Sequence, residues 1–251
     1  MESFSIGILS WHSTDVLINT LTSYHDNGLL SLCSDVKIWF QEITDDDKAI
    51  AAHYGVKAIG SKDNVGIGKA FLELAKNASH DKILFLEHDF VLIEDIEVTR
   101  KRIESGIKLL SYEYDCVRYR HRKKPGYPHF SFKYKGNELN YVDPEIKLEY
   151  PHLLDSLHWL DPAEKFPSHI GKQIIDNEEY FVTTSRFGCF TNNPCMYKKD
   201  FYIRTIKSYV GDGIDLEGKI SYDWARGGYN IAHGEGLFEH VDKSKYGGTS
   251  Y

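Results

Sequence analysis

The first hundred residues alternate between short apolar runs and segments with helix signals. The apolar runs are FSIGILSW (4–11), VKIWF (36–40), VKAIG (56–60) and KILFLE (82–87). We expect helices between them, from a cap at residues 13–15 to Leu30, from Thr44 to about Tyr54, and from Gly66 to Ala78. Strands that alternate with helices predict a parallel sheet with right-handed crossovers. The predicted fold class is therefore α/β, with a mostly parallel, Rossmann-like sheet flanked by helices.

The second half of the chain lacks this alternation. Residues 97–110 have helical periodicity, whereas residues 115–150 are rich in Tyr, His, Lys and turn residues, which predicts short strands or irregular loops. The prolines in 151–180 favour short helices. The remaining predictions are a strand, a turn and a helix start over 185–201, a helix over 213–229, and a final strand over 230–242.

Length, net charge, hydropathy and cysteine spacing limit the classes of protein to which this chain can belong. A chain of 251 residues suits a single domain, 1–251, with an N-terminal half (1–95) and a C-terminal half (96–251). The net charge of −7 argues against general nucleic-acid binding. No apolar stretch reaches the roughly 18 residues that span a bilayer, and the N-terminus lacks the basic region of a signal peptide. The four cysteines have no CxxC spacing, which argues against a zinc knuckle or disulfide framework. We expect a cytoplasmic protein.

A local basic run, RYRHRKK, occupies residues 118–124. One interpretation is a solvated strand or loop, and the other is a contact with phosphates or an anionic glycan. If the protein associates peripherally with a membrane, this run is the segment that we expect to mediate it.

Polar residues follow the predicted strands, and parallel sheets bind ligands at the carboxyl ends of their strands. The fourth strand stops at Glu87-His88-Asp89. Carboxylates at such a strand end are suited to Mg²⁺ or Mn²⁺, which bind oxygen ligands and bridge phosphates. Alternatively, Asp89 caps a following helix. The other segments expected at this edge are Ser10-Trp11-His12, Gln41-Glu42 and Gly60 to Asn64.

Two further features have both a structural and a functional interpretation. NVGIGK (64–69) is neither a Walker A motif nor a dinucleotide-binding turn. Its glycines allow the backbone to approach a ligand at a helix start, where Lys69 would face a phosphate, but a plain helix entry explains it as well. His240 is a candidate ligand for an Mn²⁺-like metal, although lone histidines are usually structural.

Together and in this order, these features resemble the GT-A glycosyltransferases, nearest the inverting family 2 group. The resemblance is clearest over residues 4–95 and about 211–240. It implies a GT-A fold with a smaller acceptor-side subregion, a nucleotide-diphosphate sugar as donor (a UDP-sugar first), and Mn²⁺ or Mg²⁺ as cofactor. The residues that it implies for donor contacts are Ser10, Trp11, His12, Gln41, Glu42, Asn64, Gly66, Lys69, Glu87 and His88, and those for the metal are Asp89 and His240.

The match to the family motifs is incomplete. The family's D-x-S-x-D-D signature corresponds to QEITDD (41–46), so its first acid falls on Gln41, and we expect Glu42 to substitute. The family's D-x-D corresponds to Glu87-His88-Asp89. Its last acid usually touches the metal, which favours Asp89.

The resemblance places the catalytic base at Asp215 or Glu217, where inverting members carry an acidic pair near the acceptor. The family's first acid falls on Ile214, and Asp212 and Asp223 are nearby competitors. Alternatively, these acids interact with a helix dipole. Asn192-Asn193-Pro194 predicts a turn, and its amides are suited to hydrogen bonds with a sugar.

The implied function is transfer of a hexose or pentose to a hydroxyl of a glycan or lipid-linked acceptor, with inversion. The alternatives are a retaining GT-A transferase, a sugar-1-phosphate nucleotidyltransferase, and a non-catalytic carbohydrate-binding protein. SWHSTD (10–15) argues against the nucleotidyltransferase, which normally has a Gly-rich, Arg-containing loop after its first strand. The sequence does not indicate an oligomeric state.

Overall fold

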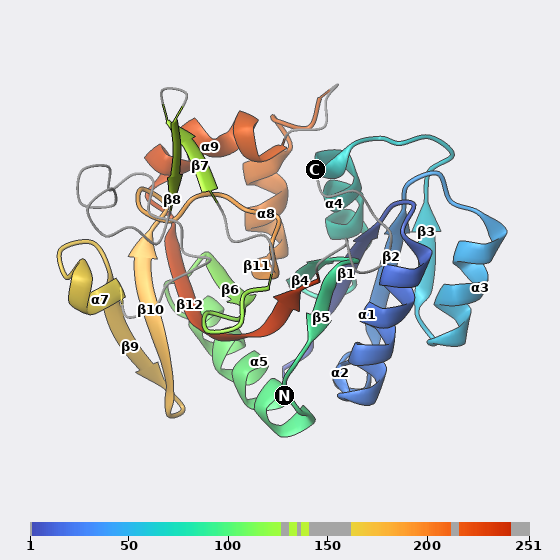
Figure 1. The fold of residues 1–251 in the computed structure, drawn as a ribbon, viewed down its shortest axis with the longest axis horizontal. Coiled ribbons are helices and arrows are strands. Elements are labelled where there is room, and N and C mark those ends of the chain that lie inside the picture. Colours follow the sequence, from blue (N-terminus) through green and yellow to red (C-terminus); the bar gives the residue numbers. More distant parts are fainter. Residues whose placement is uncertain (1, 127–130, 135–136, 141–161, 212–215, 242–251) are drawn as a thin grey trace.

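A computed structural model describes residues 2–126, 131–134, 137–140, 162–211 and 216–241 (Figure 1). The first half alternates strands and helices as predicted, and the fourth strand has the predicted bounds. These elements are β1 (Ser5–Ser10), α1 (Thr14–Asp26), α2 (Leu29–Leu32), β2 (Asp35–Phe40), α3 (Asp45–His53), β3 (Lys57–Gly60), α4 (Ile67–Asn77) and β4 (Lys82–Glu87).

The start of α3 shows how local sequence fixes an element. The Thr44 hydroxyl accepts a hydrogen bond from the Asp47 N–H, and the Asp47 carboxylate accepts one from the Thr44 N–H. Two N–H groups that have no partner within the helix are thereby satisfied, as a capping box requires. The predicted cap is confirmed.

The second half contributes strands to the same sheet and helices that cover it. Its elements are β5 (Phe90–Leu92), α5 (Ile96–Ser111), β6 (Cys116–Arg120), β7 (Ser131–Tyr134), β8 (Asn137–Asn140), α7 (Pro162–Lys165), β9 (Gly171–Ile175), β10 (Glu178–Thr184), β11 (Cys195–Lys198), α8 (Lys199–Ile206), α9 (Leu216–Gly227) and β12 (Asn230–His240).

Residues 171–184 form a β-hairpin, so the prediction of short helices over 151–180 is wrong for this part. The hairpin turns at Asp176 and Asn177, which have φ of 51° and 62°. Two consecutive positive φ values suit the twist of a tight hairpin, and Asp and Asn tolerate that conformation. The prediction that a strand begins at residue 185 is also wrong, because the strand in that segment, β11, begins only at Cys195.

The main sheet has the strand order β3-β2-β1-β4-β11-β6-β12-β10-β9, and β5 pairs with β12. Strands β1 to β4 are mutually parallel, whereas β5, β10 and β11 run against the majority direction. One apolar cluster packs α1, α2 and α5 on one face, and another packs α4, α8 and α9 on the other. In Figure 1 these two groups lie below and above the sheet. The predicted fold class is confirmed.

The interpretation of the basic run 118–124 as a solvated segment is wrong for its three arginines. The side chains of Arg118, Arg120 and Arg122 are buried. They donate to the carbonyl oxygens of Cys189, Pro125 (2.7 Å) and Gly234 (2.8 Å), respectively. Because alternate residues of a strand share a face, the three guanidinium groups extend along one side of β6 and its continuation. Lys123 and Lys124 are the exposed residues of the run.

Within the described ranges, no helix combines the length and apolar character that crossing a bilayer requires.

Candidate functional site

The carboxyl ends of β1, β2 and β4 meet at one edge of the sheet. The Ser10 carbonyl accepts a hydrogen bond from the Gln41 N–H at 3.0 Å, and the Leu9 carbonyl accepts one from the His88 N–H at 2.9 Å. The backbone continues in sheet-like pairing for one residue past β2 and β4. The predicted segments that begin at Ser10, Gln41 and Glu87 therefore lie side by side.

Trp11, His12 and Glu42 form a cluster above the ends of β1 and β2. Glu42 Oε2 accepts a hydrogen bond from Trp11 Nε1 at 2.8 Å and lies 2.6 Å from His12 Nε2. These hydrogen bonds, that of Trp11 first, hold the pKa of the Glu42 carboxyl below its usual value. The Trp11 residue remains 39% exposed. A flat aromatic surface thus lies beside an ionised carboxylate.

The backbone of this cluster is strained. His12 and Glu42 have φ of 45° and 56°. Non-glycine residues in this region cost of order 1–3 kcal/mol each, and such residues concentrate at functional sites. The two strained residues interact with each other at the edge where parallel sheets bind ligands.

The turn at Asn64 to Gly66 is held against the same edge. Gln41 Oε1 accepts a hydrogen bond from the Val65 N–H at 3.0 Å, and Asn64 Oδ1 accepts one from the Gly66 N–H at 2.9 Å. Gly66 has φ of 81° and immediately precedes α4. Gln41 is therefore buried and occupied by the turn, which explains why Glu42 rather than Gln41 is available at this edge. Lys69 is exposed on the first turn of α4.

Asp89 and His240 meet where β5 pairs with the end of β12. Asp89 Oδ2 lies 3.3 Å from His240 Nε2, and the side chains are 4% and 17% exposed. The Val241 N–H donates to the Asp89 carbonyl at 2.8 Å, which fixes the two backbones together. The negative charge of Asp89 also acts on the Tyr24 side chain of α1. Burial raises the pKa of the Tyr24 phenol, and the charge of Asp89 raises it further. The predicted metal ligands are thus in contact, although they are far apart in the sequence.

The donor atoms of this pair are suited to a divalent cation. Adjacent ligands in an octahedral shell of about 2.1 Å radius lie about 3 Å apart, close to the separation of Asp89 Oδ2 and His240 Nε2. No cluster of three or more His, Cys, Asp or Glu side chains suited to a metal occurs among the described residues. The pair offers one carboxylate oxygen, which suits Mg²⁺ or Mn²⁺, and one imidazole nitrogen, which suits a transition metal such as Mn²⁺ better than Mg²⁺.

Glu87 and His88 differ in their exposure. Glu87 is half-buried at the end of β4, whereas His88 is buried and its carbonyl accepts a hydrogen bond from the Thr20 hydroxyl at 2.7 Å. Asp89 does not cap a helix, because Asp95 caps α5. The helix-cap alternative for Asp89 is therefore wrong.

Several residues around Asp89 and His240 were not predicted. The Phe90 and His240 rings are 4.7 Å apart between centroids, and the Pro125 carbonyl accepts hydrogen bonds from the His240 N–H and Arg120 Nε. Gly126 forms a β-bridge with His240. The sequence did contain a signal that Arg120 belongs to a strand: arginines alternate from residue 118, which is typical of one face of a strand.

Glu217 lies in the first turn of α9 and contacts the predicted amide turn. Its Oε1 accepts a hydrogen bond from the Asn192 N–H at 2.7 Å, and the Asn193 Oδ1 accepts one from Arg120 Nη1 at 2.9 Å. Asp223 is exposed on α9 and bonds to Tyr209. Asp212 and Asp215 lie outside the described residues.

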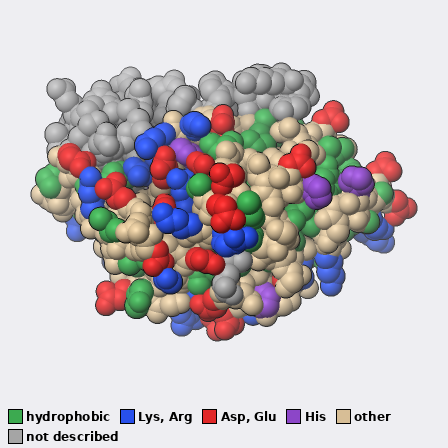
Figure 2. All heavy atoms as spheres, turned by 90° about the horizontal axis from the view of Figure 1, so that it is seen from below, with side chains coloured by type: hydrophobic (Ala, Val, Ile, Leu, Met, Phe, Trp, Pro, Cys, Tyr) green, Lys and Arg blue, Asp and Glu red, His purple; other side chains and the backbone are tan. Residues whose placement is uncertain are grey.

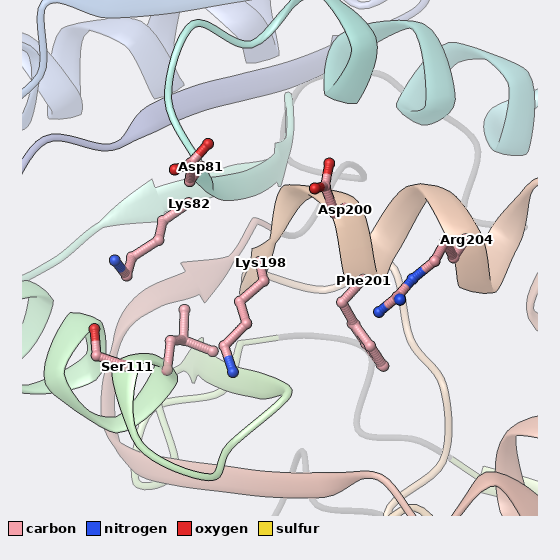
Figure 3. A pocket seen from close by; sticks show the side chains of 8 residues that line it. Asp81, Lys82, Ser111, Lys198, Asp200, Phe201 and Arg204 are labelled. Atoms are coloured by element: carbon pink, nitrogen blue, oxygen red, sulfur yellow. The ribbon is translucent and has the colours of Figure 1, made fainter.

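A cavity of about 380 Å³ opens at the opposite end of β4 from Asp89 (Figure 3). Its lining mixes acidic, basic and apolar residues, and in Figure 3 the Lys198 and Phe201 side chains extend to the same side of α8. None of the predicted site residues lines it. The cavity is therefore separate from the site at the strand ends.

No protein-family model matches this sequence, and no curated protein matches it in sequence. Solved structures do match in fold. GalNAc-T7, solved with UDP, GalNAc and Mn²⁺, has a TM-score of 0.59 at 12% identity, and the match covers 96% of this chain and 43% of that protein.

Two other solved structures also match the fold of this chain. S. aureus TarS has a TM-score of 0.57 at 13% identity, and the match covers 98% of this chain and 62% of that one. The Pyrobaculum calidifontis mannosyltransferase PcManGT, in complex with GDP-Man and Mn²⁺, has a TM-score of 0.54 at 10% identity, and the match covers 95% of this chain and 56% of that one. The chain thus spans about half the length of these proteins. Together, the architecture and these matches show that the chain has a GT-A-like fold.

Proposed function

We propose that this chain transfers a sugar from a nucleotide-diphosphate donor to a carbohydrate hydroxyl, with inversion, as the family 2 group of GT-A enzymes does. The observation that carries the proposal is the Asp89–His240 pair, 3.3 Å apart, next to His88, whose N–H bonds to the end of β1. The fold neighbours that were solved with UDP or GDP-Man and Mn²⁺ support it.

The nucleotide is assigned to the cluster of Trp11, His12 and Glu42. The exposed Trp11 ring offers a stacking surface for a base. The Glu42 carboxylate only accepts hydrogen bonds, so it suits a base edge that presents an N–H, such as the ring N–H of uracil or guanine or the amino group of cytosine. The turn at Asn64 to Gly66 and the Lys69 ammonium are assigned to the diphosphate.

The chemistry is assigned to two sets of residues. Asp89 and His240 would hold Mg²⁺ or Mn²⁺, which would supply positive charge to stabilise the leaving diphosphate. Asp215 takes the proton of the acceptor hydroxyl. The acceptor oxygen then bonds to the anomeric carbon as the carbon–oxygen bond to the diphosphate breaks on the opposite face. One such displacement inverts the anomeric configuration.

Asp215 is preferred over Glu217 as the base because Glu217 already accepts the Asn192 N–H. A carboxylate stabilised by a hydrogen bond is a weaker base. We expect Asp215→Asn to lower kcat about 100-fold, a typical contribution of a general base, and Glu217→Gln, which keeps an acceptor for Asn192, to lower it less than tenfold. Steady-state kinetics at saturating donor and acceptor measure both. The reverse order of effects would assign the base to Glu217.

Glu42→Ala is expected to weaken UDP or GDP binding roughly tenfold, because a charge-assisted hydrogen bond to the base is lost. Titration calorimetry with UDP, GDP and Mn²⁺ measures this. Asp45→Ala is the matched control, since it removes an exposed acid on α3 that pairs with Lys48. Equal loss in both variants would point to a general charge effect and contradict base recognition by Glu42.

The proposal as a whole is tested by thermal unfolding with UDP, GDP, CMP and dTDP, each with Mn²⁺, Mg²⁺ or EDTA. A ligand at a hundredfold excess over its Kd stabilises the folded state by about 2.7 kcal/mol. A shift that needs both one nucleotide and a metal supports the donor site, and NMR of the product anomer then separates inversion from retention. No shift with any nucleotide would favour a non-catalytic carbohydrate-binding protein.

A further inference from the structure

β12 has an irregularity between its two halves. Its first half pairs with β6 up to His233, opposite Arg118, and the pairing resumes at Phe238, opposite Arg120. β12 therefore advances five positions (233 to 238) while β6 advances two (118 to 120). We call residues 234–237 the β12 bulge. Beyond it, β12 pairs with β5, which places His240 opposite Phe90. The bulge thus sets the register in which His240 reaches Asp89.

Consecutive carbonyl groups in and after the bulge each have a donor. Such groups must be satisfied when they are buried. The donors are Arg122 Nε to Gly234 (2.8 Å), the Arg122 N–H to Glu235 (2.8 Å), Arg102 Nη1 to Gly236 (2.6 Å), the Ile93 N–H to Leu237 (3.1 Å) and the His121 N–H to Phe238 (2.8 Å). The Gly236 carbonyl is held by a side chain that comes from α5, outside the sheet.

Gly236 is the point where the bulge touches β6. It has φ of 95°, and a Cβ there would lie 2.4 Å from the Arg120 carbonyl oxygen. Only glycine allows this approach. The backbone of β6 therefore limits the bulge at Gly236, and Arg102 bonds to the carbonyl of the same residue.

Arg102 also pairs with carboxylates from three parts of the chain. Its guanidinium nitrogens lie 3.2 Å from Glu94, 3.3 Å from Glu178 and 3.2 Å from Glu235. The Arg102 side chain is only 11% exposed. Lys101 pairs with Glu178 and Lys123 with Glu235, so three cations face three acids. Figure 2, which shows the molecule from below, has acidic and basic side chains interspersed on that face.

We propose that Arg102 is a positioning residue for the divalent cation: it fixes the β12 bulge so that His240 meets Asp89. This inference rests on the proposed function, in which Asp89 and His240 hold the metal. Arg102 pairs with neither of them directly and acts through the backbone of β12.

The test is Arg102→Lys. Lysine keeps the charge but cannot bond Gly236 and the carboxylates at once, because it lacks the planar fork of donors. The Mn²⁺ dissociation constant is measured with UDP by electron paramagnetic resonance of free Mn²⁺, at a temperature where circular dichroism shows each protein folded. We expect affinity to fall about tenfold, the lower range for residues that orient metal ligands. At saturating Mn²⁺, kcat should stay within about twofold of the wild type.

Glu178→Gln is the matched control. It removes one carboxylate of the same network, but Glu178 belongs to β10 and not to the bulge. Its Mn²⁺ affinity should equal that of the wild type. Unchanged affinity in Arg102→Lys, even with a lower Tm, would overturn the inference, and so would equal weakening in Glu178→Gln.

Two further outcomes are informative. If Arg102→Lys does not fold, Glu235→Gln loosens Arg102 from the bulge while Gly236 is kept, and it should weaken Mn²⁺ binding about threefold. No weakening there would overturn the inference. If the wild type itself binds no Mn²⁺, the proposed metal site fails and this inference with it, whereas wild-type binding with unchanged variants defeats this inference alone.

Discussion

Asp89→Asn should abolish the stabilisation that a nucleotide and Mn²⁺ confer together, and it should lower transferase kcat/KM by about 1,000-fold, equivalent to about 4 kcal/mol. The variant keeps the shape of Asp89 and a polar contact with His240, which lies 3.3 Å away. It removes the anionic oxygen that a hard cation requires. The Tm without ligands should therefore stay close to that of the wild type. Thermal unfolding with and without UDP and Mn²⁺ measures the stabilisation and the Tm, and steady-state kinetics measure kcat/KM.

Asp81→Asn is the control for this prediction. Asp81 precedes β4 at the end opposite Asp89, is exposed, and lines the separate cavity. The same chemical change there should leave the Mn²⁺-dependent shift intact. A wild-type shift in Asp89→Asn would place the metal elsewhere and remove the main support for the proposed function.

Gly126→Ala should destabilise the protein by about 3 kcal/mol or more, at the upper end of single substitutions. Gly126 has φ of 74°, and a Cβ there would lie 2.0 Å from the His240 carbonyl oxygen and 2.5 Å from its backbone nitrogen. Both obstacles are backbone atoms, so no side-chain rotation relieves them. For a chain of this size the loss corresponds to a Tm lower by about 6–12 °C.

Gly55→Ala separates the two causes of this effect. Gly55 has φ of 68°, but a Cβ there would meet nothing within 4 Å. It should cost only the conformational penalty of about 1 kcal/mol. The same unfolding experiments compare the two variants. If Gly126→Ala is no worse than Gly55→Ala, the backbone of His240 is not packed against Gly126 as described.

Sequence periodicity predicted the first half of the fold because its signals are local. The strand Lys82–Glu87 and the helix that begins after Thr44 each depend on neighbouring residues, which the sequence displays directly. The hairpin over 171–184 was missed because prolines before it outweighed the Asp176-Asn177 turn signal.

The burial of Arg118 and Arg120 could not be predicted from composition. A run of cations is usually solvated, and these side chains are buried because distant carbonyl groups, such as that of Cys189, accept their hydrogen bonds. The Asp89–His240 contact likewise depends on the β5–β12 pairing, which no local pattern encodes. It was predicted through a family resemblance alone. The contact between Glu42 and Trp11 was not predicted, although both residues were assigned to the donor.

The Asp89–His240 contact also has a consequence for folding. One partner follows β4 in the first half of the chain, and the other ends β12 near the last described residue. Their approach closes a very long loop, so we expect the contact to form only after the central strands have assembled. A fragment that ends at residue 95 would keep Asp89 and the strand ends of β1 and β2 but lack His240. Under the proposed function, divalent-cation affinity would then report completion of the whole sheet during refolding, whereas nucleotide stacking on Trp11 would report only its first half.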